Sequence, residues 1–276
     1  MTGTLLAVDG DSFAHRAYHA LPKTIRRAGG RPAGALVGFA NMLLRLWEAE
    51  QPESVLVAWD TLEVPTYRHE ELPEYQSGRE FDDALLEQLA LLPELVESFG
   101  FAVAKAPGFE ADDFLCAVSR AWKGPVLVAT SDRDAFQLVD ERVTILQPTK
   151  GVSELARIGP AEVRERYGVE PSQVPDFVAL RGDPSDRIPG ARGVGLKKAA
   201  DVVREYGTLE AALAAGRFAV EADALRLYKR IATMDPEAPL PALRPTPPTW
   251  APAAEHAREL GLGALSQRLA DLESSA

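Results

Sequence analysis

The chain has 276 residues, of which 46% are hydrophobic, and a formal net charge of −11 at pH 7. A chain of this length and composition can bury a full core and form one large domain or two unequal ones. The sequence shows neither a basic leader with an apolar stretch nor a span of about twenty apolar residues. These features exclude a membrane-spanning class, and we expect a cytoplasmic protein with no membrane partner.

Residue counts also limit the chemistry. The single cysteine, Cys116, lies in an apolar helical pattern, so we expect a core residue rather than a reactive thiol. One cysteine and four histidines make a zinc site improbable. The acidic balance alone argues against nucleic acid, because phosphate binders carry basic patches. However, nine carboxylates are assigned below to one site, and the rest of the chain is then nearly neutral, so DNA is not excluded.

The first half of the chain alternates strands with helices. Three short apolar runs end on aspartates, at Asp9, Asp60 and Asp132, and are typical of buried parallel strands. The other predicted elements of this half are helices over 33–50, 83–99, 110–122 and 134–138, and strands over 101–104 and 143–147. Such alternation indicates an α/β fold with a doubly wound, parallel central sheet flanked by helices. We assign this domain to residues 1–158.

The remaining segments have different patterns. Residues 63–82 are polar, contain two prolines and are too long for an ordinary connection, which favours a mobile functional loop. From residue 159 the pattern is helical with glycine and proline breaks, so we predict a smaller helical subdomain over 159–240. Residues 236–252 are rich in proline and predicted to be irregular. One helix over 256–272 is predicted within a C-terminal extension, 241–276.

The strongest functional signal is a set of carboxylates. Each acidic cluster taken alone is explained at least as well by a turn or a helix cap, and Asp9 and Asp60 taken alone are better explained in that way. In a doubly wound sheet, however, the carboxyl ends of the strands meet at one edge, where ligands bind. Clustered carboxylates without histidine suit hard divalent cations. The predicted catalytic and metal-binding residues are Asp9, Asp60, Glu110, Asp112, Asp113, Asp132, Asp134, Asp183 and Asp186.

This many oxygen ligands would serve two magnesium ions roughly 4 Å apart. The chemistry indicated is hydrolysis of a phosphodiester. A metal pair lowers the pKa of a water molecule and stabilises the attacking and leaving oxygens, so no side-chain nucleophile is needed.

A second signal lies in residues 188–200. Gly193 and Gly195 permit a tight hairpin whose backbone can approach a phosphate, and Lys197 and Lys198 add positive charge at the start of a helix. A Gly-x-Gly pair alone is equally typical of a simple turn between helices. Because the hairpin follows Asp183 and Asp186 closely, we interpret it as a site that binds the DNA backbone independently of base sequence.

The chain resembles a known family in the motifs that carry these residues. The matching motifs, in chain order, are Val8-Asp9-Gly10, Arg16-Ala17-Tyr18-His19-Ala20-Leu21-Pro22, Tyr67-Arg68-His69-Glu70, Glu110-Ala111-Asp112-Asp113, Ser131-Asp132-Arg133-Asp134 and Gly182-Asp183-Pro184-Ser185-Asp186. They are similar to those of the 5′-nuclease or flap endonuclease superfamily, in particular the bacterial 5′-3′ exonuclease domain that begins DNA polymerase I. The resemblance extends to about residue 240. It implies a PIN-like (resolvase-like) nuclease fold with a helix-hairpin-helix-type DNA-binding subdomain.

The resemblance also implies roles for particular residues. Asp9, Asp60, Glu110 and Asp112 would surround one metal ion, and the other five carboxylates would serve the second or bridge the two. Residues 63–82 would form a helical arch that admits a free 5′ end. The residues expected to contact DNA are Arg16, Arg68, Tyr75, Arg79, Gly193, Gly195, Lys197 and Lys198. The hairpin carbonyls would also hold a potassium ion.

Several positions depart from the family pattern. Gln76 stands where a lysine of the arch is usual, so a cation near the scissile phosphate is lost. Asp11 replaces a small neutral residue, Arg187 an asparagine and Lys198 a threonine. We hypothesise that the arch chemistry is weakened here and the metal chemistry retained.

The function expected is therefore a stand-alone, Mg²⁺-dependent 5′-3′ exonuclease or flap endonuclease of replication and repair, with Mn²⁺ as an alternative metal. Its partners would be DNA with 5′ ends, flaps or nicks and RNA–DNA hybrids, and we expect a monomer. Two alternatives stay open. In a haloacid-dehalogenase-like phosphatase, Asp9 would be the nucleophile and Asp11 the acid. In a non-catalytic DNA-binding protein, only the hairpin would act.

Overall fold

The computed structural model describes residues 3–61, 64–78, 81–150, 154–245 and 247–274, except the side chain of Lys150. Its centre is a six-stranded sheet in the order β3-β2-β1-β4-β5-β6. The strands are β1 (Leu5–Asp9), β2 (Ser54–Ala58), β3 (Ala102–Ala104), β4 (Val126–Ala129), β5 (Val143–Lys150) and β6 (Glu154–Ile158). All neighbours pair in parallel except β5 and β6, which are antiparallel. The predicted parallel sheet is therefore confirmed.

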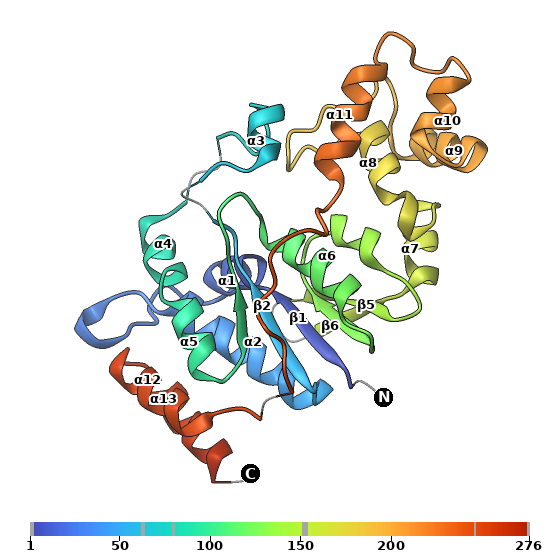
Figure 1. Cartoon of the computed structure of the whole chain (residues 1–276). Helices are drawn as coiled ribbons and strands as arrows, with labels where there is room; N and C mark the ends of the chain where they lie inside the picture. The colour runs from blue at the N-terminus through green and yellow to red at the C-terminus, as the bar shows by residue number, and fades with distance from the viewer. Residues whose placement is uncertain (1–2, 62–63, 79–80, 151–153, 246, 275–276) are drawn as a thin grey trace.

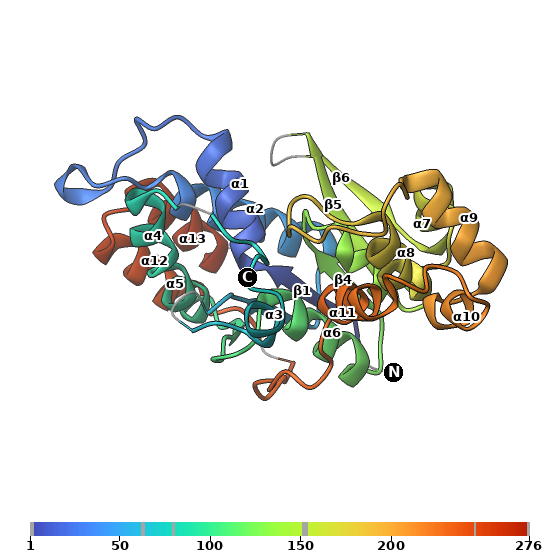
Figure 2. The same ribbon diagram turned by 90° about the horizontal axis from the view of Figure 1, so that it is seen from above.

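The two faces of the sheet belong to two cores. Leu5 and Ala7 of β1 pack into one core, and Leu6 and Val8 into the other, as the two-residue period of a strand requires. The second core also contains residues of α1 (Gly10–Ala20), α2 (Gly34–Glu50), α4 (Asp83–Leu89) and α5 (Leu92–Ser98). The first contains those of α6 (Ala111–Ala121) (Figures 1 and 2). Because β1, β2 and β4 are buried along their whole length, their sequences are continuous apolar runs.

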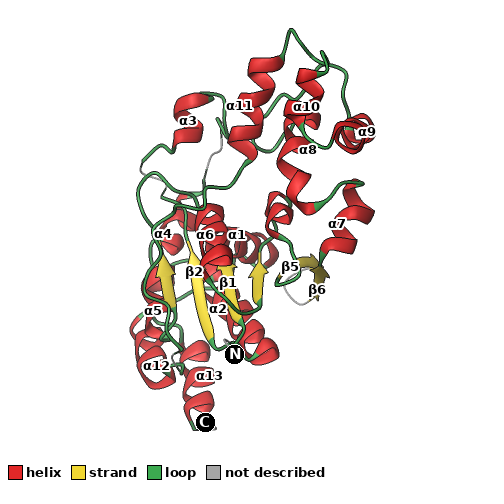
Figure 3. Cartoon of the chain, turned by 45° about the vertical axis from the view of Figure 1, so that its right-hand side comes forward, coloured by secondary structure: helices red, strands yellow, loops and turns green. Residues whose placement is uncertain are grey.

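The second half is helical, as predicted. It contains α7 (Pro160–Tyr167), α8 (Val174–Arg181), α9 (Leu196–Tyr206), α10 (Leu209–Ala214) and α11 (Ala222–Ala232). The parallel strands point toward this helical part and α3 (Tyr67–Glu71), so their carboxyl ends face the junction (Figure 3). Short 3₁₀ turns span Ala28–Gly30, Asp134–Leu138 and Pro171–Gln173.

The C-terminal segment returns to the first domain. Helices α12 (Trp250–Glu259) and α13 (Gly263–Glu273) contact α5 and α2, and Trp250 is buried against Trp47, Phe99 and Phe101. No helix in the described ranges is long and apolar enough to cross a membrane.

Two predicted elements were wrong in detail, and one strand was missed. The helix expected over 83–99 is two helices, because Pro93 in the first turn of α5 has no N–H to continue the α4 hydrogen-bond ladder. The helix expected over 256–272 starts at Trp250 and is interrupted where Gly261 adopts a left-handed conformation (φ 76°). Strand β6 was not predicted, since it is an exposed edge strand with only Ile158 fully buried.

Candidate active site

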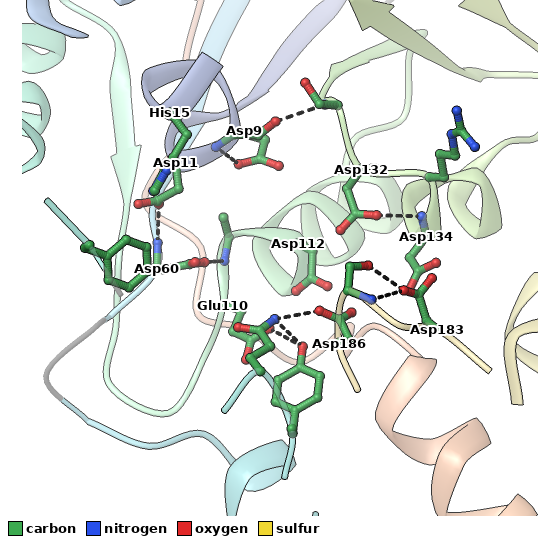
Figure 4. A pocket seen from close by; sticks show the side chains of 18 of the residues that line it. Asp9, Asp11, His15, Asp60, Glu110, Asp112, Asp132, Asp134, Asp183 and Asp186 are labelled. Atoms are coloured by element: carbon green, nitrogen blue, oxygen red, sulfur yellow. Dashed lines mark hydrogen bonds between the residues drawn. The ribbon is translucent and has the colours of Figure 1, made fainter. Parts of the chain in front are cut away.

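A pocket of about 690 Å³ lies at the carboxyl edge of the sheet. Eight of the nine predicted carboxylates line it: Asp9, Asp60, Glu110, Asp112, Asp132, Asp134, Asp183 and Asp186 (Figure 4). They come from the ends of three strands, the first turn of α6, the 3₁₀ turn after β4 and the loop after α8. The sheet topology therefore gathers side chains that are distant in the sequence.

Asp9 is held firmly at the end of β1. Its carboxylate accepts the backbone N–H of Ser12 (2.9 Å), which caps α1, and the hydroxyl of Thr130 (2.6 Å). Burial raises the pKa of Asp9 to about 7, and the charges of Asp60 and Asp132 add to the shift. A proton or a cation must therefore compensate this carboxylate near neutral pH.

Asp60 follows β2 and links three elements. Its carboxylate accepts the N–H of Ala111, the first residue of α6 (2.7 Å). Its own N–H donates to the carboxylate of Asp11 in the first turn of α1 (2.7 Å). Asp11 also lines the pocket, and burial raises its pKa well above the usual range. The structure thus adds Asp11 to the site as a support for the Asp60 backbone.

Glu110 caps α6 and is oriented by two hydroxyl donors. Thr66 donates to Oε1 (3.1 Å) and Tyr75 to Oε2 (3.0 Å). Burial raises the pKa of Glu110 to about 7, although the Arg68 guanidinium, 3.5 Å away, opposes the shift. Tyr75 is buried in the pocket wall, so its hydroxyl acts on Glu110 in this structure.

Asp113 does not line the pocket. Its carboxylate is fully buried and accepts two hydrogen bonds from Arg68 (2.9 and 2.7 Å) and the backbone N–H groups of Glu110 and Asp235. With its oxygens engaged in this way, Asp113 is a structural partner of Arg68 and not an available metal ligand. The prediction missed that Glu110 and Asp113 form a capping box, whose fourth residue points back to the cap.

The same contact corrects the role of Arg68. Only 1% of Arg68 is exposed, and its Nε donates to the carbonyl of Ile231 in α11 (3.0 Å). An enclosed guanidinium cannot contact a DNA phosphate as expected. Arg68 instead links α3 to α6, through Asp113, and to α11, through the Ile231 carbonyl. Arg79, the other cation predicted for the arch, lies outside the described residues.

The remaining carboxylates lie on two loops. Asp132 accepts the N–H of Asp134 (2.8 Å), and burial raises the pKa of Asp134, with the charge of Asp132 contributing. Asp183 pairs with Arg181 (2.7 Å), a cation that the prediction did not include and that also lines the pocket. Asp186 accepts a hydrogen bond from the amide of Gln76 (3.1 Å).

The glycine hairpin lies between α8 and α9. Gly193 has a φ of 72°, and a Cβ atom at either Gly193 or Gly195 would meet nothing within 4 Å. These glycines therefore leave the backbone accessible and do not serve close packing. Lys197 and Lys198 are exposed, and the Lys198 ammonium contacts the carbonyl of Gly193 (3.0 Å). Arg16, on α1, is partly exposed.

The pocket has the chemistry of a hard-cation site. Its acidic side chains offer only oxygen ligands, and burial raises the pKa values of Asp9, Glu110 and Asp112, with neighbouring carboxylates adding to each shift. Oδ1 of Asp112 is buried without a hydrogen bond, 3.7 Å from the Arg68 guanidinium. Among the described residues, no three His, Cys, Asp or Glu side chains already form a group able to hold a metal ion.

Together, a parallel sheet, an acidic pocket at its carboxyl edge and a helical unit with an open hairpin define an α/β protein built around an oxygen-donor site. Residues 4–168 match the family model described as "5′-3′ exonuclease, N-terminal resolvase-like domain". Residues 169–248 match "5′-3′ exonuclease, C-terminal SAM fold". The chain belongs to the 5′-3′ exonuclease family, and the predicted fold class is confirmed. The finer domain limits, at 158 and 240, stay predictions.

Curated relatives support this assignment. The chain is 44% identical over 211 residues to DNA polymerase I of Mycobacterium tuberculosis, covering 75% of this chain and 23% of that protein. It is 42% identical over 212 residues to the thermostable DNA polymerase I of Thermus thermophilus, covering 75% and 24%. The chain thus spans about a quarter of the length of these relatives.

Solved structures share the fold. A T5 5′-exonuclease with bound divalent zinc ions aligns with a TM-score of 0.69 at 18% identity, covering 97% of this chain and 98% of that one. The catalytic core of Rad2 in complex with DNA aligns with a TM-score of 0.63 at 15% identity, covering 98% and 91%.

Proposed function

We propose that the chain is a divalent-metal-dependent 5′-3′ exonuclease or flap endonuclease, which hydrolyses DNA phosphodiesters at 5′ ends, flaps or nicks in replication and repair. The convergence of eight carboxylates in one pocket of a 5′-3′ exonuclease fold is the observation that carries this proposal. The zinc ions and the DNA named for the T5 and Rad2 structures support it.

Each carboxylate has a place in the proposal. Asp9, Asp60, Glu110 and Asp112 would hold one Mg²⁺, and Asp132, Asp134, Asp183 and Asp186 the other, with Mn²⁺ able to replace either. When bound, such ions supply Lewis acidity to the scissile phosphate and to water. The chain's own residues orient these ligands: Thr130 on Asp9, Asp11 on the Asp60 backbone, and Thr66 and Tyr75 on Glu110. We expect 5′-phosphate and 3′-hydroxyl products.

DNA would be held by its backbone. The open hairpin at Gly193 and Gly195, with Lys197 and Lys198, offers N–H groups and positive charge, and Arg16 is partly exposed on the nuclease side. Tyr75, which the sequence suggested as a DNA contact, is buried and bonded to Glu110, so we assign it to the pocket wall instead. A potassium ion at the hairpin would compete with the Lys198 ammonium for the Gly193 carbonyl. RNA–DNA hybrids, a monomeric state and a cytoplasmic location also stay predictions.

The phosphatase alternative finds no support. The carboxylate of Asp11, the acid in that model, accepts the backbone N–H of Asp60 and so already has a structural role. That model also leaves Asp183 and Asp186 in the pocket without a role.

The test is cleavage of 5′-end-labelled flap, nicked and single-stranded DNA, and of an RNA–DNA hybrid, with Mg²⁺ or with EDTA. We expect cleavage only with Mg²⁺, and product lengths will separate flap incision from stepwise trimming. DNA binding without cleavage at any Mg²⁺ concentration would contradict the proposal and favour the binding-only alternative.

A further inference from the structure

Two loops meet at the rim of the pocket. One is the turn after α3, residues 74–78, and the other follows α8, residues 183–188. The Gln76 N–H donates to the carbonyl of Asp186 (3.2 Å), and the Arg187 guanidinium donates to the Ser77 hydroxyl (2.8 Å). Gln76 (φ 49°) and Arg187 (φ 57°) both have left-handed backbones, which are unusual for long side chains. Such conformations persist only where the surrounding contacts fix them.

Side chains connect the same loops to two carboxylates of the site. The Gln76 amide nitrogen donates to the Asp186 carboxylate (3.1 Å) and to the Tyr75 hydroxyl (2.8 Å), and Tyr75 donates to Glu110 (3.0 Å). Metal binding requires both carboxylates in the ionised form, and in that form they can only accept, which fixes the direction of this chain. The residue between them must therefore supply two hydrogens, as a glutamine amide does. Glu110 and Asp186 lie on the same side of the pocket (Figure 4).

We infer that Gln76 is a positioning residue. It fixes the position of the Asp186 carboxylate relative to Glu110, and so keeps the ligands of the second proposed metal ion correctly placed relative to those of the first. This inference rests on the proposed function, since it assigns both carboxylates to metal. It also gives position 76 a role other than the lost substrate cation expected from the sequence. An amide suits this role because it donates to the Asp186 carboxylate and to the Tyr75 hydroxyl without adding charge to a half-buried site.

The neighbouring contact supplies a matched control. Ser77 lies in the same turn, contacts the same opposite loop through Arg187 and does not line the pocket. Loss of its hydroxyl weakens the contact between the loops without removing a hydrogen bond to a carboxylate of the site.

The experiment uses the full chain and three variants. Gln76→Met keeps the side-chain length and removes both donors, Gln76→Lys keeps a donor, and Ser77→Ala is the control. The first readout is the rise in Tm that Mg²⁺ produces without DNA, the second is the Mg²⁺ concentration for half-maximal cleavage, and the third is DNA affinity in EDTA.

We expect Gln76→Met to raise the half-maximal Mg²⁺ concentration about tenfold and to reduce the Mg²⁺-dependent rise in Tm, as is typical for the loss of a partner that orients metal ligands. Ser77→Ala should stay close to the parent in every readout, and DNA affinity in EDTA should be unchanged in Ser77→Ala and Gln76→Met. Gln76→Lys keeps a donor but adds a positive charge, so it should bind DNA more tightly and should need less additional Mg²⁺ than Gln76→Met.

Two results would overturn the inference. Gln76→Met could match the parent in both Mg²⁺ readouts, or it could weaken DNA binding in EDTA with an unchanged Mg²⁺ requirement, which would make Gln76 a substrate contact. A parent chain that neither cleaves DNA nor responds to Mg²⁺ would instead refute the proposed function, so the two failures are distinguishable.

Discussion

Two adjacent aspartates of α6 have opposite surroundings. Asp112 faces the pocket, and its buried Oδ1 makes no hydrogen bond and lies 3.7 Å from the Arg68 guanidinium, whereas Asp113 is fully buried and bonded to Arg68 at 2.7 Å. Asp112 therefore keeps an oxygen that can bind a cation in the pocket, and the charge of Asp113 is satisfied inside the protein. Within this site, therefore, the role of a carboxylate depends on its position in the helical turn.

The variant Asp132→Asn tests whether this carboxylate is a metal ligand that cleavage requires. Asp132→Asn keeps an oxygen that can accept the Asp134 N–H, so the loop should retain its conformation. Removal of the negative charge should lower the cleavage rate at least about a hundredfold, because a metal centre supplies several kcal/mol to the transition state. The rate is measured under single-turnover conditions, and DNA binding should be retained. Cleavage at the parent rate would show that Asp132 is not a ligand.

The variant Arg68→Met tests how much the buried ion pair between Arg68 and Asp113 stabilises the fold. Arg68→Met should lower the free energy of unfolding by about 3–5 kcal/mol, because it leaves the buried Asp113 charge without its partner. Urea denaturation measures this loss. The double variant Arg68→Met/Asp113→Asn should recover part of it, since the unpaired charge is gone. A loss below about 1 kcal/mol in the single variant would contradict the structural role of this pair.

At the scale of elements, strand ends and helix termini position the site. Carboxylates that follow β1, β2 and β4 reach the edge of the sheet together with those that begin α6. Apolar runs predict buried strands well, so the sequence was sufficient to place Asp9, Asp60 and Asp132 at one edge. It could not show which residue of the first turn of α6 faces inward, or that Gln76 and Arg187 meet across two loops, because these contacts depend on tertiary packing.

The hairpin before α9 yields a prediction about ions. Because the Lys198 ammonium already contacts the Gly193 carbonyl, DNA affinity should be nearly equal in KCl and NaCl at the same ionic strength. Fluorescence anisotropy with labelled flap DNA in EDTA measures both affinities. The variant Lys198→Thr should weaken binding and reduce its salt dependence, since a phosphate-binding cation is removed. A parent chain that binds several-fold more tightly in KCl would show that potassium displaces Lys198.

At the scale of the whole molecule, the two halves meet around buried negative charge. Residues of α8 and α11 share a core with those of β1 and α6, and Arg68 joins α3, α6 and α11. Packing of this kind holds the carboxylates together even though they repel one another. The metal-free protein should therefore be most stable where some of them are protonated.

The stability of the metal-free protein should therefore depend on pH. The pKa values of Asp9 and Glu110 are raised to about 7 from 3.8 and 4.5, so the unfolded chain releases these protons first as the pH rises. Their contribution to stability is present below about pH 4 and is lost as the pH passes through about 7. In EDTA, Tm should fall between pH 5 and pH 8, and Mg²⁺ should restore it at pH 8. Asp9→Asn should show a shallower fall, and an equal fall in parent and variant would refute this assignment.

The central claim is that this pocket binds divalent cations between its carboxylates. Anomalous diffraction from crystals of the chain soaked in Mn²⁺ tests it most directly. We expect anomalous peaks inside the pocket, one near Asp9, Asp60, Glu110 and Asp112 and one near Asp132, Asp134, Asp183 and Asp186. Well-ordered density for these side chains with no peak among them, or peaks only at other acidic positions, would contradict it.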